Sequence, residues 1–179
     1  MGGNAGVACF YFDFAAPEEQ SPVIVLGSVL KQLIGGLDKV PEKIVNAFRD
    51  RRRVVGSKLV LSEMVEFLQD ITSSRPTFIC IDALDECQEG YRLKLLDSLN
   101  QILQKSPGAR LFLTGRPHIR SEFERHLAGR AATRWITPTK NDIITFFRAK
   151  LREDTMPDAM DEILDEEIIQ NLPGAVSEM

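Results

Sequence analysis

Three carboxylates follow a short apolar run near the middle of the chain. The run occupies residues 78–81, Asp82 comes directly after it, and Asp85 and Glu86 follow within four residues. A continuous apolar run of this length is typical of a strand buried on both faces, as in a parallel sheet. Open α/β sheets bind ligands where their strands end, so the three acids form a candidate ligand site. The alternative is structural, with Asp85 and Glu86 complementing the dipole of a helix N-terminus.

The segment Phe-Ile-Cys-Ile-Asp-Ala-Leu-Asp-Glu-Cys, residues 78–87, resembles the Walker B segment of a NACHT-type (STAND class) P-loop NTPase. It is similar to the segment of fungal incompatibility-type proteins and of nephrocystin-3-like N-terminal domains. In that pattern an apolar strand leads to an Asp, a small residue, an apolar residue and Asp-Glu, which residues 82–86 match position by position. Residues 114–117, Thr-Gly-Arg-Pro, resemble the family's sensor segment, usually Thr-Ser-Arg-Pro, and Gly115 is the departure. The resemblance covers most of residues 7–175.

The resemblance implies a role for each of these polar residues. Asp82 would hold Mg²⁺ through water, because Mg²⁺ keeps several waters and takes few carboxylates. Asp85 or Glu86 would orient or deprotonate the attacking water. The sensor residues Thr114 and Arg116 would read the γ-phosphate, so that ATP and ADP favour different arrangements in a signalling switch. A planar, permanently charged guanidinium suits phosphate oxygens, and the alternative is an arginine that caps the strand end against an acid.

The family's phosphate loop has no counterpart in the 179 residues, which contain no G-x-x-x-x-G-K-[ST] sequence. No lysine follows the glycines of residues 1–6 before Lys31, so we interpret them as a flexible start. The resemblance implies that residues 7–14 form the second strand of the family's sheet and that the loop precedes this chain. We therefore expect the chain to bind ATP weakly or not at all. Two alternatives stay open: a non-catalytic interaction or oligomerisation module that retains the NTPase fold, and an incomplete gene model.

Buried apolar runs alternate with amphipathic segments along the chain. Together with the resemblance, this predicts an α/β fold: a three-layer parallel sheet of the P-loop NTPase type, lacking its first strand, with a C-terminal helical extension. Strands are expected at residues 7–14, 77–82 and 109–114, with helices on both faces. Helices are expected at 22–37, from 41 onward, and at 61–71, 95–103, 119–127, 141–151 and 160–172, with a weak strand at 134–137. We interpret residues 7–138 as a partial NACHT/P-loop NTPase domain and 139–179 as the truncated start of the extension.

The strand at 109–114 is expected to have an incomplete edge. In the family's sheet the strand before the phosphate loop lies beside it. Here it either keeps one unpaired edge or pairs with the weak strand at 134–137. Leu111, Phe112 and Leu113 are apolar, and an exposed apolar edge is a template for aggregation. We therefore expect residues 1–179 alone to be aggregated or partly unfolded.

The composition narrows the classes of partner. The net charge is −4 and no basic stripe is present, so a nucleic-acid footprint is not expected. No apolar run approaches 18 residues, so no membrane span is expected. Cys9, Cys80 and Cys87 show no C-x-x-C spacing, which favours reduced thiols and a cytoplasmic location. The sequence places no third ligand near His118 or His126, so no metal site is expected there. Other proteins, or further copies of this chain, are the expected partners.

Overall fold

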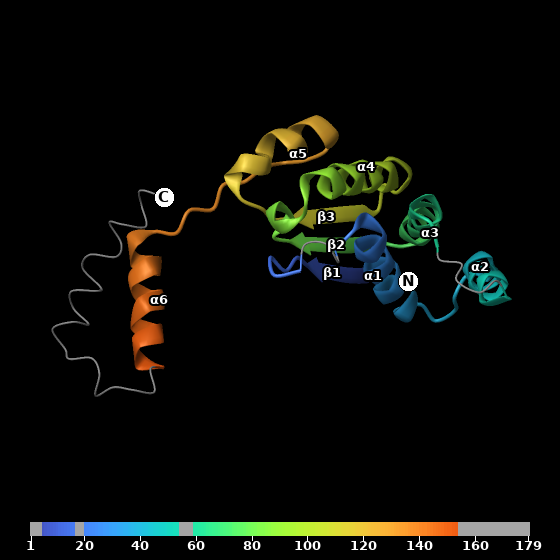
Figure 1. Ribbon diagram of the computed structural model, residues 1–179, viewed down its shortest axis with the longest axis horizontal. Helices are drawn as coiled ribbons and strands as arrows, with labels where there is room; N and C mark the ends of the chain where they lie inside the picture. Colours follow the sequence, from blue (N-terminus) through green and yellow to red (C-terminus); the bar gives the residue numbers. More distant parts are fainter. Residues whose placement is uncertain (1–4, 17–19, 54–58, 154–179) are drawn as a thin grey trace. The chain divides into compact units, whose positions relative to one another are not determined.

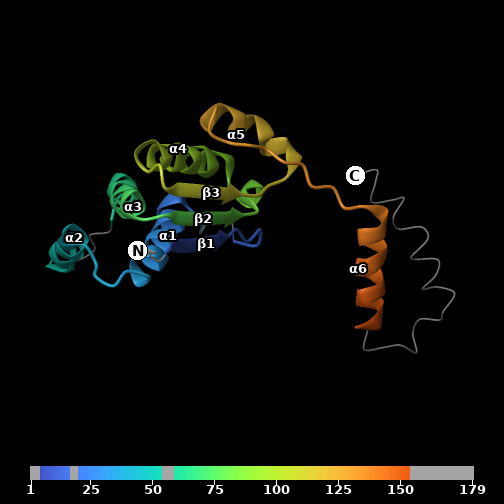
Figure 2. The same ribbon diagram turned by 180° about the vertical axis from the view of Figure 1, so that it is seen from behind.

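The computed structural model describes residues 5–16, 20–53 and 59–153. It contains a sheet of three parallel strands in the order β1 (Gly6–Tyr11), β2 (Thr77–Asp82) and β3 (Ala109–Leu113). Figures 1 and 2 show the strands side by side, with β2 between the other two. The α/β class, the positions of β2 and β3 and the parallel pairing confirm the sequence predictions.

Helices connect the strands and cover one face of the sheet. The helices that the structure describes along the whole chain are α1 (Pro22–Gly35), α2 (Glu42–Arg53), α3 (Leu61–Ser74), α4 (Glu89–Lys105), α5 (Arg120–His126) and α6 (Lys140–Arg152), with the 3-10 turns η2 (Leu84–Glu86) and η3 (Pro117–Ile119). Helices α1, α3 and α4 contact one another and share one hydrophobic core with Ile79 and Ile81 of β2. Figure 1 shows α4 next to β3. Each fully buried leucine or isoleucine of this core contributes about 1.5–3 kcal/mol.

The other face of the sheet is exposed in the part of the chain that the structure describes. Side chains alternate between the two faces of a strand. Val7, Tyr11, Phe78 and Phe112 therefore point away from the core, and they are 59%, 70%, 47% and 65% exposed. The prediction of helices on both faces is wrong for the described residues. An apolar run predicts a strand, but it does not show whether another element packs over each face of that strand.

The outer edge of β1 forms hydrogen bonds with a glutamine side chain instead of with another of the described strands. The Gln32 amide of α1 donates to the Cys9 carbonyl at 2.8 Å, and its oxygen accepts from the Cys9 amide at 2.9 Å. Beyond the strand, the Gln20 side chain bonds the backbone N–H and C=O of Asp13, at 2.8 and 2.6 Å. This turn ends β1 at Tyr11, three residues before the predicted end at residue 14.

The outer edge of β3 pairs with no strand among the described residues. Of the two alternatives, the unpaired edge is therefore the one that the described residues show, and the alternative pairing with a strand at 134–137 is wrong, because residues 131–139 have no regular structure. All of them are exposed, so this segment buries no apolar face that would hold a strand against the sheet.

The contacts divide the chain into two compact units, one ending at Ala131 and one beginning at Ala132. In the second unit, α6 starts with a capping box: Asp142 accepts from the Thr139 amide at 2.8 Å, and Thr139 accepts from the Asp142 amide at 3.2 Å. The helix predicted at 141–151 is confirmed, with its cap two residues earlier. The helix predicted at 160–172 lies outside the described residues. No described helix is both long enough and apolar enough to cross a bilayer.

Candidate functional site

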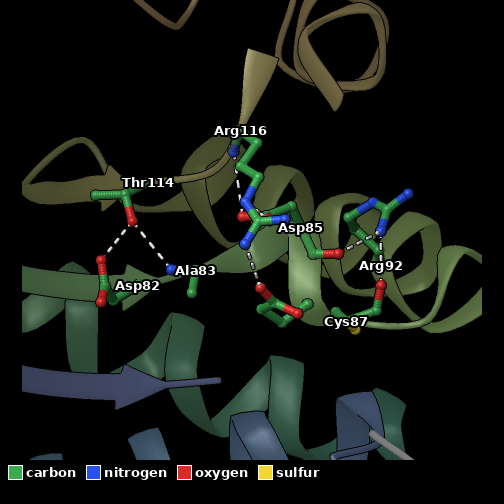
Figure 3. Close-up of polar contacts among 8 residues, drawn as sticks. Asp82, Ala83, Asp85, Cys87, Arg92, Thr114 and Arg116 are labelled. Carbon is green, nitrogen blue, oxygen red and sulfur yellow. Dashed lines mark hydrogen bonds and ion pairs between the residues drawn. The ribbon is translucent and has the colours of Figure 1, made fainter. Parts of the chain in front are cut away.

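The loops after β2 and β3 are tied together by Thr114. Its hydroxyl donates to Asp82 and accepts from the Ala83 amide at 3.0 Å (Figure 3). Its backbone continues the pairing, because Thr114 N donates to the Ile81 carbonyl and Leu84 N donates to the Thr114 carbonyl. Parallel strands end at the same edge of a sheet, so the two motifs of the sequence meet at that edge.

Ala83 turns the chain sharply away from β2. It is the only described residue other than glycine with a positive φ, at 54°. The left-handed conformation costs a residue with a Cβ of the order of 1 kcal/mol, and a small side chain limits that cost. The turn leads directly into η2, which carries Asp85 and Glu86. The small residue that follows Asp82 and precedes the acids of η2 thus has a local structural reason.

Arg116 faces the two acids of η2. Its backbone N–H donates to Asp85 at 3.1 Å, and its guanidinium lies 3.4 Å from Asp85 and 3.3 Å from Glu86 (Figure 3). The Asp85 side chain is 5% exposed, whereas that of Arg116 is 72% exposed. Asp85 is therefore enclosed by its partners, and the guanidinium remains open to solvent on its outer side.

The glycine at position 115 has a packing reason. A Cβ built there would lie 2.6 Å from Cδ1 of Ile119 and 3.5 Å from the Asp85 carboxylate. Ile119 is buried beneath this loop. Serine, the usual residue of the sensor segment, would therefore require Ile119 to move. The position of Ile119 therefore accounts for glycine instead of serine at residue 115.

Arg92 belongs to this site, although the sequence analysis did not single it out. It lies on α4, and its guanidinium donates to the Cys87 carbonyl at 2.6 Å and to Glu122 of α5 at 2.6 and 2.7 Å. The hydrogen bonds from Arg92 hold the pKa of Glu122 below its usual value. The sequence did offer a signal: Arg92 precedes Leu95 by three residues, and this helical spacing places it on the same face as the apolar residues of the predicted helix.

The structure thus brings together Asp82, Asp85, Glu86, Thr114 and Arg116, as their positions after two neighbouring strands predict. Their contacts also match the simpler alternative, in which Arg116 caps a strand end against acids. Asp85 and Glu86 lie in η2, ahead of α4, rather than in the first turn of a long helix. The individual roles of the five residues stay predictions.

The donor set suits Mg²⁺ better than a transition metal. The described residues hold no group of three or more His, Cys, Asp or Glu placed to share a metal ion. Asp82 is exposed, and the one hydrogen bond described for its carboxylate comes from Thr114. Mg²⁺ is commonly held by one or two carboxylates with water completing its shell. Asp82 therefore fits a water-rich Mg²⁺ site, while the 179 residues supply no lysine-containing phosphate loop for ATP.

Fold and site together define an α/β protein in which acids and an arginine meet at the carboxyl edge of a parallel sheet. Comparison with protein families gives a match to the family described as Nephrocystin 3, N-terminal, over residues 2–116. The match covers more than half of the chain and includes both loops of the site, so the chain belongs to this family. Searches of curated proteins and of solved structures gave no match.

Proposed function

We propose that this chain forms the magnesium-facing and γ-phosphate-facing half of a NACHT-type nucleotide-dependent signalling switch in the cytoplasm. The supporting observation is the contact between the two loops: Arg116, after β3, reaches Asp85 and Glu86, after β2. Asp82 opens to solvent at the same edge. Ligands of open α/β sheets bind at this edge.

The roles follow from how exposed each group is. Asp82 would hold Mg²⁺ through water, and the ion would supply charge neutralisation for a phosphate. Asp85 is enclosed by Arg116, so its task in this proposal is to position the arginine. Glu86 is more exposed, at 27%, and is the better placed of the two acids to orient a water molecule. The outer side of the Arg116 guanidinium would take the phosphate oxygens.

The same contacts supply a route by which a phosphate would be sensed. Arg116 leads through η3 into α5, and α5 is joined to α4 by the Glu122–Arg92 pair. Arg92 also holds the Cys87 carbonyl at the end of the acidic loop. A phosphate that drew Arg116 away from Asp85 and Glu86 would therefore change contacts between both loops and α5. A ligand shifts such an equilibrium only by its different affinity for the two arrangements.

The first experiment is calorimetry of residues 1–179 with Mg-ATP. We expect no appreciable binding, because phosphate affinity in P-loop proteins comes chiefly from the loop and its lysine. A micromolar dissociation constant, about −8 kcal/mol, would contradict this and require another phosphate site.

The second experiment starts from the upstream transcript. If it encodes an in-frame G-x-x-x-x-G-K-[ST] segment, the longer protein is expected to bind Mg-ATP. Arg116→Ala should then reduce the preference for ATP over ADP by at least about tenfold, because a charge-assisted hydrogen bond contributes about 1.5–3 kcal/mol. Arg110→Ala is the matched control, since Arg110 lies at the start of the same strand and bonds local carbonyls. Equal behaviour of the two variants would exclude the sensor role.

A second candidate function is a non-catalytic module for protein interaction or self-association. The exposed apolar face of the sheet and the open edge of β3 favour it. Sedimentation velocity over a range of concentrations separates the two functions. A defined oligomer, with no nucleotide effect on the longer protein, would support the interaction module.

A further inference from the structure

Two of the three cysteines lie side by side on the exposed face of the sheet. Cys9 of β1 and Cys80 of β2 are register partners on neighbouring parallel strands, so their side chains leave the same face. Both are partly exposed, whereas Cys87 is buried. This pair takes no part in the proposed nucleotide site, and the inference drawn from it is independent of that site.

The surroundings of the pair are largely apolar. Phe112 is the register partner of Cys80 on its other side, and Val7 pairs with Phe78 one step back along the same face. The Gln32 side chain makes two hydrogen bonds to the backbone of Cys9, one to its N–H and one to its C=O. The two side chains therefore project from the same face of adjacent, hydrogen-bonded strands.

Without a ligand, the Cys80 thiol favours its protonated form. Burial, followed by the charge and hydrogen bond of Cys9, raises the pKa of Cys80. The Cys9 thiol in turn raises the pKa of the Tyr11 hydroxyl on the same face. Two thiolates this close repel each other unless a cation lies between them.

The strand geometry favours a bridging atom over a direct disulfide. A disulfide requires the two Cβ atoms to lie about 3.5–4.5 Å apart. Register partners on parallel strands project side by side, separated by about the strand spacing of 4.7–4.9 Å. The direct bond would therefore require the two strands to move closer together, while a bridging ion accommodates the wider separation.

In the described part of the chain, the presence of only two thiol ligands at this pair favours some metal ions over others. Zn²⁺ in structural sites takes four ligands. The described residues place no third His, Cys, Asp or Glu with this pair. Soft thiolate ligands select Cu(I), which is satisfied by two sulfur atoms.

We propose that Cys9 and Cys80 form a two-thiolate site for a soft monovalent cation of the Cu(I) class. On binding, each thiol releases one proton to solvent and the cation forms one bond to each sulfur, with no change of oxidation state. The complex carries one negative charge and joins the edge strand β1 to β2.

The test titrates the full reduced chain anaerobically with Cu(I) in competition with the chromogenic chelator bicinchoninate. We expect one bound ion per chain, at least a tenfold loss of affinity in Cys9→Ser and in Cys80→Ser, and no change in Cys87→Ser. Burial raises the pKa of Cys87 to about 11, which makes it a matched unreactive control. Circular dichroism of each variant checks the fold.

A measurement on the unmodified chain avoids dependence on variants. Cu(I) should protect Cys9 and Cys80 from alkylation by iodoacetamide, as mapped by mass spectrometry, while the weak labelling of Cys87 stays unchanged. Protection of only one cysteine of the pair would overturn the proposal. So would full Cu(I) affinity in either serine variant, equal affinity for Zn²⁺, or quantitative Cys9–Cys80 disulfide formation under mild oxidant.

Discussion

Glu122 and Glu124 lie on the same short helix and differ in what they pair with. Glu122 meets Arg92 at 2.6 and 2.7 Å, where the arginine side chain is 8% exposed. Glu124 meets Arg120 with both side chains about half exposed. Replacing each glutamate by alanine therefore compares a buried ion pair with a surface one in a single helix.

The two substitutions should lower the free energy of unfolding by clearly different amounts. Removing one partner of a buried pair costs about 3–5 kcal/mol, because the remaining charge stays buried and uncompensated. Glu122 is 18% exposed and Arg92 keeps the Cys87 carbonyl, so we expect Glu122→Ala to cost about 3 kcal/mol, near the lower limit of that range. An exposed pair contributes about 0–1 kcal/mol, so Glu124→Ala should cost at most that.

Urea unfolding at low protein concentration measures both values. With a slope of about 2 kcal/mol/M, the midpoint for Glu122→Ala should fall by about 1.5 M and that for Glu124→Ala by less than about 0.5 M. Equal shifts for the two variants would refute the assignment of Arg92 as a buried, ion-paired link between α4 and α5.

Acidic pH provides a second check on the same pair. The folded-state pKa of Glu122 lies below its ordinary value of 4.5, so the stabilisation is fully present above about pH 4.5 and is lost as the pH falls through the folded pKa. The stability difference between the wild type and Glu122→Ala should be constant near neutrality and decrease in acid. A difference that grows in acid would contradict the sign of this shift.

Substitutions at three further positions test the loops and the exposed face of the sheet. Ala83→Val should lower the free energy of unfolding by about 1–2 kcal/mol, because a β-branched residue resists a φ of 54°, while Ala83→Gly should cost less, both measured in urea. Gly115→Ser should lower it by about 1–3 kcal/mol through the close approach to Ile119, and an unchanged midpoint would show that Ile119 moves freely. Phe112→Lys should raise the monomeric fraction in sedimentation velocity, whereas Phe112→Leu should not, because Phe112 is exposed beside the unpaired edge of β3.

The sequence alone determined where β2 and β3 lie and which polar residues follow each of them. The apolar run before Asp82 and the run before Thr114 each define a strand, since local side-chain pattern decides which residues extend. Parallel strands then place both following loops at one edge, so the meeting of Asp82, Asp85 and Arg116 could be predicted. The small residue at position 83 was also part of the recognisable pattern.

The tertiary structure decided what depends on partners distant in sequence. Only the packing shows that Phe78 points to an exposed face, because the run of residues 78–81 is equally apolar whether or not a helix covers it. The end of β1 depends on the Gln20 side chain, and the role of Arg92 depends on Glu122, thirty residues away. The alignment of Cys9 with Cys80 requires the register of two strands about 70 residues apart, which long-range pairing sets and local pattern does not.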